Sequence, residues 1–276
     1  MSENKQGYYV PTPSIWPIVG SLALLSLAIG ATLLFNDLKG GLPMLGIGFA
    51  ILVYMLFGWF GTVIRESESG RYNRQVDTSF RWSMSWFIFS EVMFFSAFFG
   101  ALFYARVISV PMLATQKLLW PNFVASWPSS GPYLTNAFRP MQAWGIPAIN
   151  TLILLTSGAT LTWAHWGLVK NNRVQLKLGL LVTVLLGLSF VTLQAHEYLH
   201  AAFSLSTGVY GCTFFMLTGF HGLHVMLGTT MLIVMLVRSL KGHFTPEHHF
   251  AFEAAAWYWH FVDVVWLLLF IFVYWL

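Results

Sequence analysis

Residues Tyr198–Val237 read YLHAAFSLSTGVYGCTFFMLTGFHGLHVMLGTTMLIVMLV and form a run of 40 positions without Asp, Glu, Lys or Arg. A bilayer core is crossed by a helix of about 20 apolar residues, so this run is roughly twice as long as one span requires. Ser204, Ser206, Thr207 and Gly208 provide a polar start for a helix. We therefore predict one long membrane helix that begins near residue 208.

Six further windows have the length and apolar character of membrane spans, and together with the first they predict seven transmembrane helices. They are Ser14–Asn36, Gly40–Ile64, Trp82–Ala105, Pro140–Val169, Leu178–Ala195 and Ala254–Leu276. Prolines interrupt the outer loop of about residues 108–140, beginning with Pro111, and they argue against continuous helix there.

The composition excludes a soluble protein. Only 9% of the 276 residues are charged and 57% are hydrophobic, whereas soluble domains carry about 25% charged residues. The same composition excludes intrinsic disorder, which requires low hydrophobicity. The net charge is +4, but the basic residues form no stripe of the kind that binds nucleic acid.

Basic residues orient the seven spans. If the N-terminus is inside, the inner segments hold ten of the 14 Lys and Arg residues and the outer segments hold four. The positive-inside rule therefore predicts a cytoplasmic N-terminus, with residues 1–13 as a short tail, and a C-terminus on the outer side.

Ionisable side chains inside apolar spans are functional candidates because they are costly to bury in a membrane. Glu91 lies in the phenylalanine-rich segment Phe87–Phe99 and is the one carboxylate that we expect clearly within the apolar part of a span. Such surroundings favour a raised pKa. Two interpretations stay open: a proton or gating site, and a neutral carboxyl that hydrogen-bonds to a neighbouring helix.

Histidines form the second group of candidates. His221 and His224 share one helix face and lie among Gly219, Gly222 and Gly228, which indicates a tight helix contact. We prefer a hydrogen-bonding role across this contact to ligation of a metal or haem. We expect His260 and Asp263 to pair with each other, three residues apart.

The remaining polar groups are expected at span ends. We expect His196, Glu197 and His200 to form a solvated cap, and His243, His248 and His249 to lie in a solvated inner loop. Arg65 and Arg238 close two spans on the inner side, where an arginine either satisfies the topological bias or holds a lipid phosphate.

Several segments closely resemble subunit III of the haem–copper cytochrome c oxidases, in the same order and from about residue 14 to the end. They are VIRES (63–67), FIFSEVMFFSAFF (87–99), TWAHWGL (162–168), GVYGCTFFMLTGFHGLHVMLGT (208–229) and HHFAFEAAAWYWHFVDVVWLLLF (248–270).

The resemblance implies an all-α polytopic fold. A two-helix unit, residues 14–66, would be separated by a lipid-filled V-shaped cleft from a five-helix bundle, residues 80–276. It also implies a subunit without catalytic residues, metal or cofactor of its own. Haem a, haem a3, CuA and CuB would belong to the partner subunits I and II, with subunit I in direct contact and cytochrome c as the substrate of the complex.

The resemblance also implies roles for single residues. Glu91 matches a buried family carboxyl linked to proton uptake, oxygen access and protection of subunit I from inactivation during turnover. The resemblance implies phospholipid head-group contacts for Arg65, Arg238 and Trp59. It leaves His221, His224, His260 and Asp263 as helix-packing polar residues.

The sequence departs from the mitochondrial pattern in two places. The segment ESGRYNRQ, residues 68–75, lacks the histidine pair usual there, so the resemblance does not carry a lipid or proton-surface contact to this segment. The outer loop is longer than in animal mitochondrial versions, and this length favours a bacterial inner membrane. Three alternatives stay open: a quinol oxidase subunit, whose relatives usually lack the first two spans; an independent transporter or channel; and a haem-ligating enzyme built on His221, His224 and His260.

Overall fold

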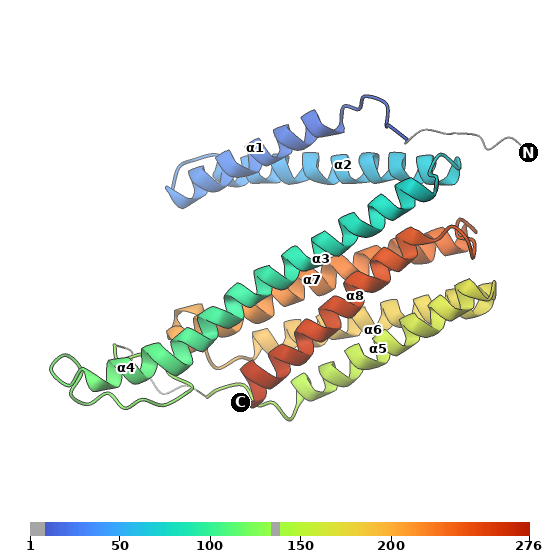
Figure 1. Ribbon diagram of the computed structural model, residues 1–276. Coiled ribbons are helices and arrows are strands. Elements are labelled where there is room, and N and C mark those ends of the chain that lie inside the picture. Colours follow the sequence, from blue (N-terminus) through green and yellow to red (C-terminus); the bar gives the residue numbers. More distant parts are fainter. Residues whose placement is uncertain (1–8, 134–138) are drawn as a thin grey trace, which may run out of the picture. The chain divides into compact units, whose positions relative to one another are not determined.

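The computed structural model describes residues 9–133 and 139–276, and every regular element in this part is helical. Residues 1–8 of the predicted tail and 134–138 of the predicted outer loop lie outside the described residues. The elements are α1 (Trp16–Phe35), α2 (Gly41–Glu68), α3 (Arg74–Phe103), a π-helical segment (Tyr104–Ser109), α4 (Val110–Thr115), α5 (Ile146–Val169), α6 (Arg173–Leu199), a short 3-10 helix (Leu205–Thr207), α7 (Val209–Leu240), α8 (Phe250–Leu269) and a second π-helical segment (Phe270–Trp275) (Figure 1).

Within this part of the chain, seven helical segments are long and apolar enough to cross a membrane. They are α1, α2, the continuous segment from α3 through α4, α5, α6, α7, and α8 with its π-helical extension. The predicted number of seven spans and the all-α class are therefore confirmed, and so is the start of the sixth span, since α7 begins at Val209.

The third span is longer than predicted. The helix continues past residue 108 to Thr115, and Pro111 lies in the first turn of α4. Our expectation that the prolines exclude continuous helix from about residue 108 was wrong for residues 108–115. A π-helical segment directly precedes Pro111, and in it the Val110 amide bonds to the Ala105 carbonyl. Proline is tolerated in a first helical turn, and the wider π turn offers local adjustment around it.

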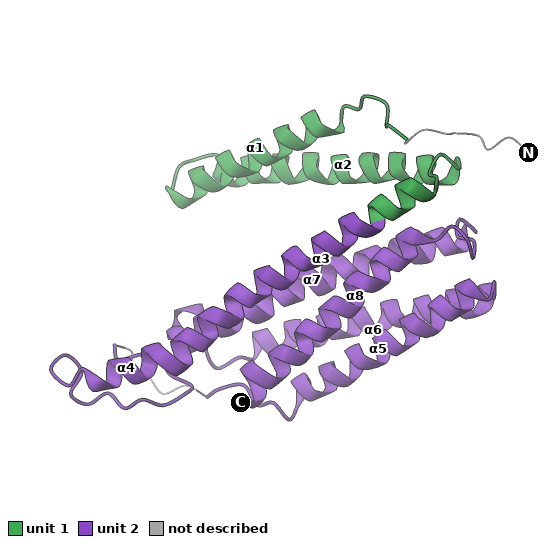
Figure 2. Cartoon of the chain, viewed as in Figure 1, with its two compact units in different colours: residues 1–80 green, residues 81–276 purple. Residues whose placement is uncertain are grey.

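The chain divides into two compact units, residues 1–80 and 81–276 (Figure 2). In the first unit, α1 and α2 pack through glycines that bring their backbones close together. A Cβ atom on Gly48 would lie 2.8 Å from the Leu27 amide nitrogen, and one on Gly30 would lie 2.6 Å from the Leu45 amide nitrogen. Small residues at such contacts are the usual means of packing membrane helices.

In the second unit, α5 packs on α6, α6 on α7, α7 on α8 and α8 on α5, which closes a ring. α3 packs on α7 and α8 through aromatic side chains: Phe95 lies 5.0 Å from the His224 ring, and Phe87 stacks on Tyr258 at 6.1 Å. Among the described spans, α8 is the most enclosed.

Trp259 of α8 joins the four helices of this ring. Its side chain is fully buried, and a Cβ on Gly187 of α6 or Gly228 of α7 would lie 2.8 Å from its indole ring. Its indole N–H donates to the Ser157 hydroxyl of α5 at 2.9 Å. The two glycines therefore leave the space that the indole fills.

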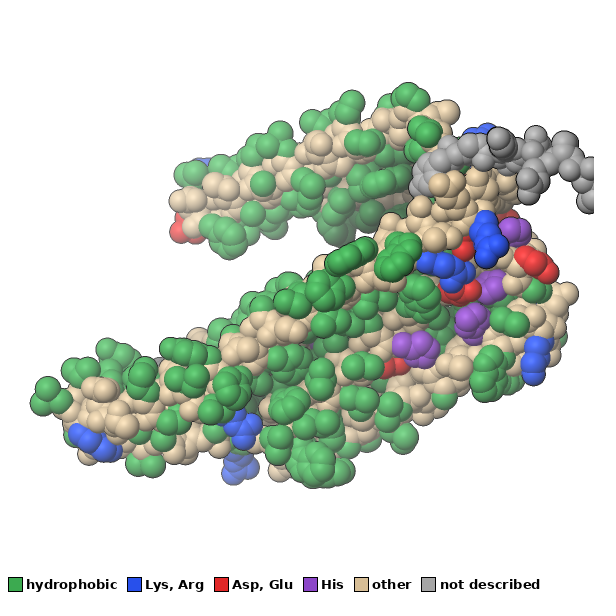
Figure 3. All heavy atoms as spheres, in the orientation of Figure 1, with side chains coloured by type: hydrophobic (Ala, Val, Ile, Leu, Met, Phe, Trp, Pro, Cys, Tyr) green, Lys and Arg blue, Asp and Glu red, His purple; other side chains and the backbone are tan. Residues whose placement is uncertain are grey.

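Hydrophobic side chains cover the middle of the helices on the face shown in Figure 3, and most charged and histidine side chains lie toward helix ends. Large apolar residues such as Leu152 and Leu185 are more than half exposed. Lipid tails solvate such residues as well as a protein interior would, so exposure of this kind is typical of membrane helices.

Candidate functional site: polar groups within the apolar spans

Glu91 of α3 meets His224 of α7. The Glu91 Oε2 atom lies 2.9 Å from the His224 Nε2 atom, and the two side chains are 21% and 10% exposed. The rings of Phe94 and Phe95 lie 6.0 and 5.0 Å from the imidazole. The structure thus shows a hydrogen bond between Glu91 and a neighbouring helix. This bond is compatible with both interpretations of Glu91, the proton or gating site and the neutral carboxyl.

The second nitrogen of His224 determines how protons are arranged in this pair. Its Nδ1 atom lies 2.6 Å from the Phe220 carbonyl oxygen, which can only accept, so Nδ1 carries a proton. Two forms remain: protonated Glu91 donates to Nε2, or imidazolium Nε2–H donates to ionised Glu91. Both forms are neutral overall and differ only in the position of one proton, which limits the cost of burying the pair in an apolar region.

His221 connects α7 to α8. It is fully buried, and its Nε2–H donates to the Val262 carbonyl oxygen at 3.2 Å. The expectation that three glycines mark this contact was wrong for two of them. A Cβ on Gly219 or Gly222 would meet nothing within 4 Å among the described residues, whereas one on Gly228 would touch Trp259. Helix rotation places these residues on different faces, which spacing alone did not reveal.

His260 and Asp263 of α8 lie close to each other, with His260 Nδ1 at 3.7 Å from Asp263 Oδ2. The His260 Nε2 atom lies 3.5 Å from the Thr162 hydroxyl of α5. Asp263 is buried, and a Cβ on Gly158 would lie 2.7 Å from its Oδ2 atom. This group therefore links α8 to a close-packed face of α5.

Glu197 is not part of a solvated cap, contrary to our expectation. It is only 3% exposed, while His196 and His200 are exposed and stack at 4.1 Å. Helix α6 continues to Leu199, and Glu197 follows the buried Phe190 and Gln194 on its inward face, since residues three and four apart share a face. Among the described residues, Glu197 and Asp263 are more deeply buried within the chain than Glu91.

Polar side chains that bond to one another lie near Glu197 at its end of α6. The Gln194 amide donates to the Tyr274 hydroxyl at 3.3 Å, and the Asn150 amide of α5 approaches Gln194 Oε1 at 3.4 Å. Tyr198 donates to the Thr218 hydroxyl of α7 at 2.7 Å. The carboxyl thus lies in a polar layer between helices.

The three residues expected to contact lipid differ in exposure. Arg65 is exposed in the last turn of α2 and donates to the Thr62 hydroxyl at 3.0 Å, and Trp59 is 47% exposed. Arg238 is only 6% exposed, and its guanidinium lies 4.5 Å from the centre of the Phe244 ring. The arrangement therefore suits a head-group contact more directly at Arg65 and Trp59 than at Arg238.

The turn between α2 and α3 has its own polar contact. The Tyr72 hydroxyl donates to Glu66 Oε2 at 3.0 Å. Burial raises the pKa of Tyr72, and the hydrogen bond to Glu66 raises it further. The hydroxyl therefore keeps its proton and remains a donor to the carboxylate that follows Arg65.

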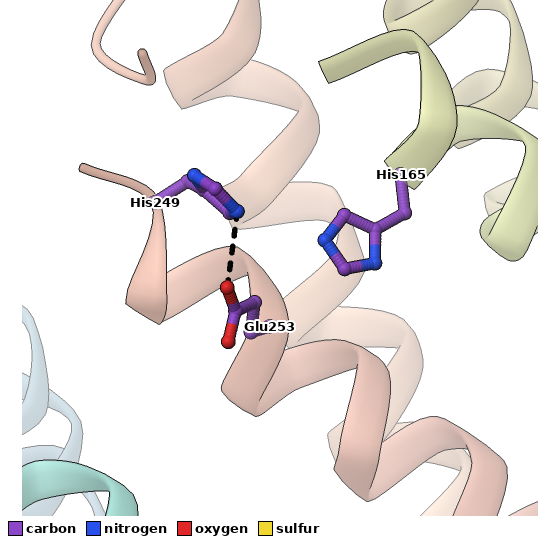
Figure 4. A group of neighbouring side chains, drawn as sticks. All are labelled: His165, His249 and Glu253. Carbon is purple, nitrogen blue, oxygen red and sulfur yellow. Dashed lines mark ion pairs between the residues drawn. The ribbon is translucent and has the colours of Figure 1, made fainter. Parts of the chain in front are cut away.

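A further cluster was missed by sequence reasoning. His165 of α5, His249 just before α8 and Glu253 of α8 lie together, and His249 Nε2 is 3.0 Å from Glu253 Oε1 (Figure 4). The expectation that His249 is solvated was wrong, since its side chain is 11% exposed. The spacing of His249 and Glu253, four residues apart at a helix start, was a signal for their pairing, but nothing in the sequence placed His165 beside them.

Seven apolar helices with polar side-chain contacts between them define a multi-pass helical membrane protein. Residues 6–276 match the family described as cytochrome c oxidase subunit III. The chain is 43% identical to cytochrome c oxidase subunit 3 of Marchantia polymorpha over 273 residues, which cover 99% of this chain and 97% of the relative. It is 43% identical to that of Loxodonta africana over 276 residues, which cover 100% of this chain and 99% of the relative.

The chain belongs to the cytochrome c oxidase subunit III family. This membership places it in the respiratory chain, as a subunit of a haem–copper oxidase complex.

Proposed function

We propose that this chain is a non-catalytic subunit of a proton-pumping cytochrome c oxidase. In this proposal, haem a, haem a3, CuA and CuB lie in partner subunits I and II, and this chain contacts subunit I directly. It supports assembly, proton uptake, oxygen access and the lifetime of subunit I during turnover. The engagement of the His221, His224 and His260 imidazoles with protein groups supports this division of labour over a haem-ligating role.

The proposed membrane is a bacterial inner membrane, with the N-terminus cytoplasmic and the C-terminus periplasmic. The segments expected on the same side of the membrane as the N-terminus hold ten of the 14 Lys and Arg residues, which supports this orientation. The presence of α1 and α2 supports cytochrome c over quinol as the electron donor. The equivalent subunits of quinol oxidases usually lack these two spans. Oxidation of reduced cytochrome c, but not of quinol, by the purified complex tests this choice.

The contact between Glu91 and His224 carries the proposed role in proton uptake and turnover. A carboxyl and an imidazole at 2.9 Å can exchange one proton without changing their joint charge. Such a pair can hold or pass a proton within apolar surroundings without exposing a net charge to them. Glu91 retains 21% exposure, so the pair is not sealed inside this chain.

We expect Glu91→Gln to leave the haem content and assembly of the complex unchanged. The glutamine amide still donates to His224 Nε2 but has no acidic proton. Proton uptake should slow, or the number of turnovers before inactivation should fall severalfold, as measured by stopped-flow proton uptake and by prolonged oxygen consumption. Loss of haem from the variant complex would contradict this assignment.

The partner residue provides the control for this experiment. If the pair acts as a unit, His224→Gln should reproduce the Glu91→Gln effect, and the double variant should be no worse than either single variant. Ser96→Ala serves as a matched control on α3, because the Ser96 hydroxyl bonds only to the Val92 carbonyl of its own helix among the interactions described. Additive losses from Glu91 and His224 would contradict a shared function.

We further propose that Arg65 and Trp59 hold a phospholipid head group at the inner end of α2. Hydrogen bonds to charged groups contribute roughly 1.5–3 kcal/mol, so Arg65→Gln should weaken retention of the lipid by roughly 10- to 100-fold. Native mass spectrometry of the delipidated and re-lipidated complex measures this loss. Arg71→Gln is the matched control, since Arg71 is exposed in the following turn. Equal lipid loss in both variants would contradict a specific contact.

A further inference from the structure

Three potential metal ligands come together at one end of the second unit. His165 lies near the end of α5, His249 immediately precedes α8, and Glu253 lies in its first turn. One ligand atom from each lies within 4.8 Å of the other two. Figure 4 shows the His165 ring directed toward the His249–Glu253 pair. All three residues are partly buried, so their positions are restricted by the surrounding helices.

The surroundings of His249 already have the form of a metal-bound histidine. Its Nδ1–H donates to the Thr245 carbonyl oxygen at 3.0 Å, which directs Nε2 toward Glu253. A histidine that binds a metal through one nitrogen almost always donates its other N–H to a carbonyl or carboxylate. The His165 ring lies 5.6 Å from the His249 ring, and one nitrogen of His165 lies within 4.8 Å of a ligand atom of each of the other two residues.

We propose that His165, His249 and Glu253 bind a divalent transition-metal cation, with water as the fourth ligand. Two imidazoles and one carboxylate form the ligand set that Zn²⁺ takes in open tetrahedral sites. Mg²⁺ and Ca²⁺ prefer oxygen ligands and do not fit. This site has no part in the proton and lipid roles proposed above and does not depend on them.

Arg81 of α3 sets the strength of this site. Its guanidinium forms an ion pair with Glu253 Oε2 and lies 5.2 Å from the centre of the Phe250 ring. Glu253 Oε1 faces His249, on the side where the metal would bind. The positive charge of Arg81 opposes a bound cation, as does the positive end of the α8 dipole. The site is therefore weaker than a closed structural zinc site.

Zinc titration of the assembled oxidase complex tests the proposal, after a chelator has removed loosely bound ions. Loss of a residue that only hydrogen-bonds to a metal ligand already weakens metal binding by roughly 10- to 100-fold, so His165→Ala and His249→Ala should each weaken one zinc equivalent by about 100-fold or more. His248→Ala, next to the cluster but exposed, should keep that equivalent. Haem content and thermal midpoint must match those of the parent complex. Equal zinc affinity in the parent and His165→Ala complexes would overturn the proposal.

Two further measurements do not depend on loss of binding. The zinc-edge X-ray absorption spectrum of the parent complex, after subtraction of that of the His249→Ala complex, should show imidazole nitrogens at about 2.0–2.1 Å from the zinc. Arg81→Gln removes the competing charge and should tighten zinc binding severalfold, and weaker binding in an assembled Arg81→Gln complex would contradict the assigned carboxylate. If His196→Ala abolishes the tight equivalent, the zinc is bound adventitiously at the exposed His196–His200 pair and the proposal fails.

Discussion

Replacing Trp259 with alanine is expected to lower the free energy of unfolding by about 3–5 kcal/mol, the range found when a buried tryptophan or phenylalanine is truncated. The indole is fully buried and fills the space left by Gly187 and Gly228. Its loss opens a cavity that neither Gly187 nor Gly228 can fill, because a glycine has no side chain. It also removes the hydrogen bond to Ser157.

The effect is measured by heating the purified complex and recording the temperature at which this chain is released. Trp166→Ala is the matched control, because Trp166 of α5 is 59% exposed and its truncation leaves no enclosed cavity. Trp259→Phe separates the two contributions. It keeps most of the ring volume but removes the N–H donor, whose hydrogen bond is worth about 1 kcal/mol. An equal loss of stability in the Trp166 and Trp259 variants would contradict this packing role.

The same contact predicts coupling between Gly228 and Trp259. A Cβ on Gly228 would lie 2.8 Å from the indole Cε3 atom, closer than real Cβ contacts. Gly228→Ala should therefore destabilise the parent protein, yet the alanine should be tolerated in the Trp259→Ala background, where its methyl group enters the cavity. Additive effects of the two substitutions would mean that the residues do not share this space.

Gly48→Leu is expected to separate α1 from α2. Overpacking of a well-packed contact costs about 1–3 kcal/mol. The cost here should lie at the upper end, because a Cβ on Gly48 would meet the Leu27 amide nitrogen at 2.8 Å and the Ala23 carbonyl oxygen at 3.1 Å. These are backbone atoms and cannot rotate away as a side chain does.

Hydrogen exchange in detergent, read peptide by peptide, localises this effect. Amides of α1 and α2 should exchange faster in Gly48→Leu, while those of α5 to α8 remain protected, because local opening follows loss of local contacts. Gly46→Leu carries the same substitution on the same helix, where a Cβ meets nothing within 4 Å in the described part of the chain. Faster exchange in Gly46→Leu but not in Gly48→Leu would contradict the helix contact.

The polar pairs show the limit of sequence reasoning. The cost of ionisable groups in apolar spans made Glu91, His224, His260 and Asp263 visible as candidates. Their partners were visible only when they lay on the same helix, as with His260 and Asp263. Glu91 and His224 are 133 positions apart, and Trp259 and Ser157 are 102 apart. No spacing rule within one helix reaches a partner on another.

Buried or exposed position was also hidden in the sequence. Because Glu197 lies between two histidines at the end of a span, we expected it to be solvated. In helix α6, His196 faces outward, and the next residue, Glu197, faces inward. Gly219 and Gly228 belong to the same helix, yet only Gly228 contacts a neighbouring ring. In both cases the rotation of the helix about its axis decides, and that rotation comes from packing.

The sequence by itself determined the number of spans and the all-helical class, because the thickness of the bilayer sets the length of each apolar run and every backbone group must be paired within it. Within the run Tyr198–Val237, the polar residues Ser204, Ser206, Thr207 and Gly208 also predicted the start of α7 near residue 208. Tertiary structure alone decided which faces meet: Trp259 against Gly187 and Gly228, and His165 beside His249. These helices are apolar on all sides, and lipid is as apolar as a neighbouring helix, so hydrophobicity carries no record of which face turns inward.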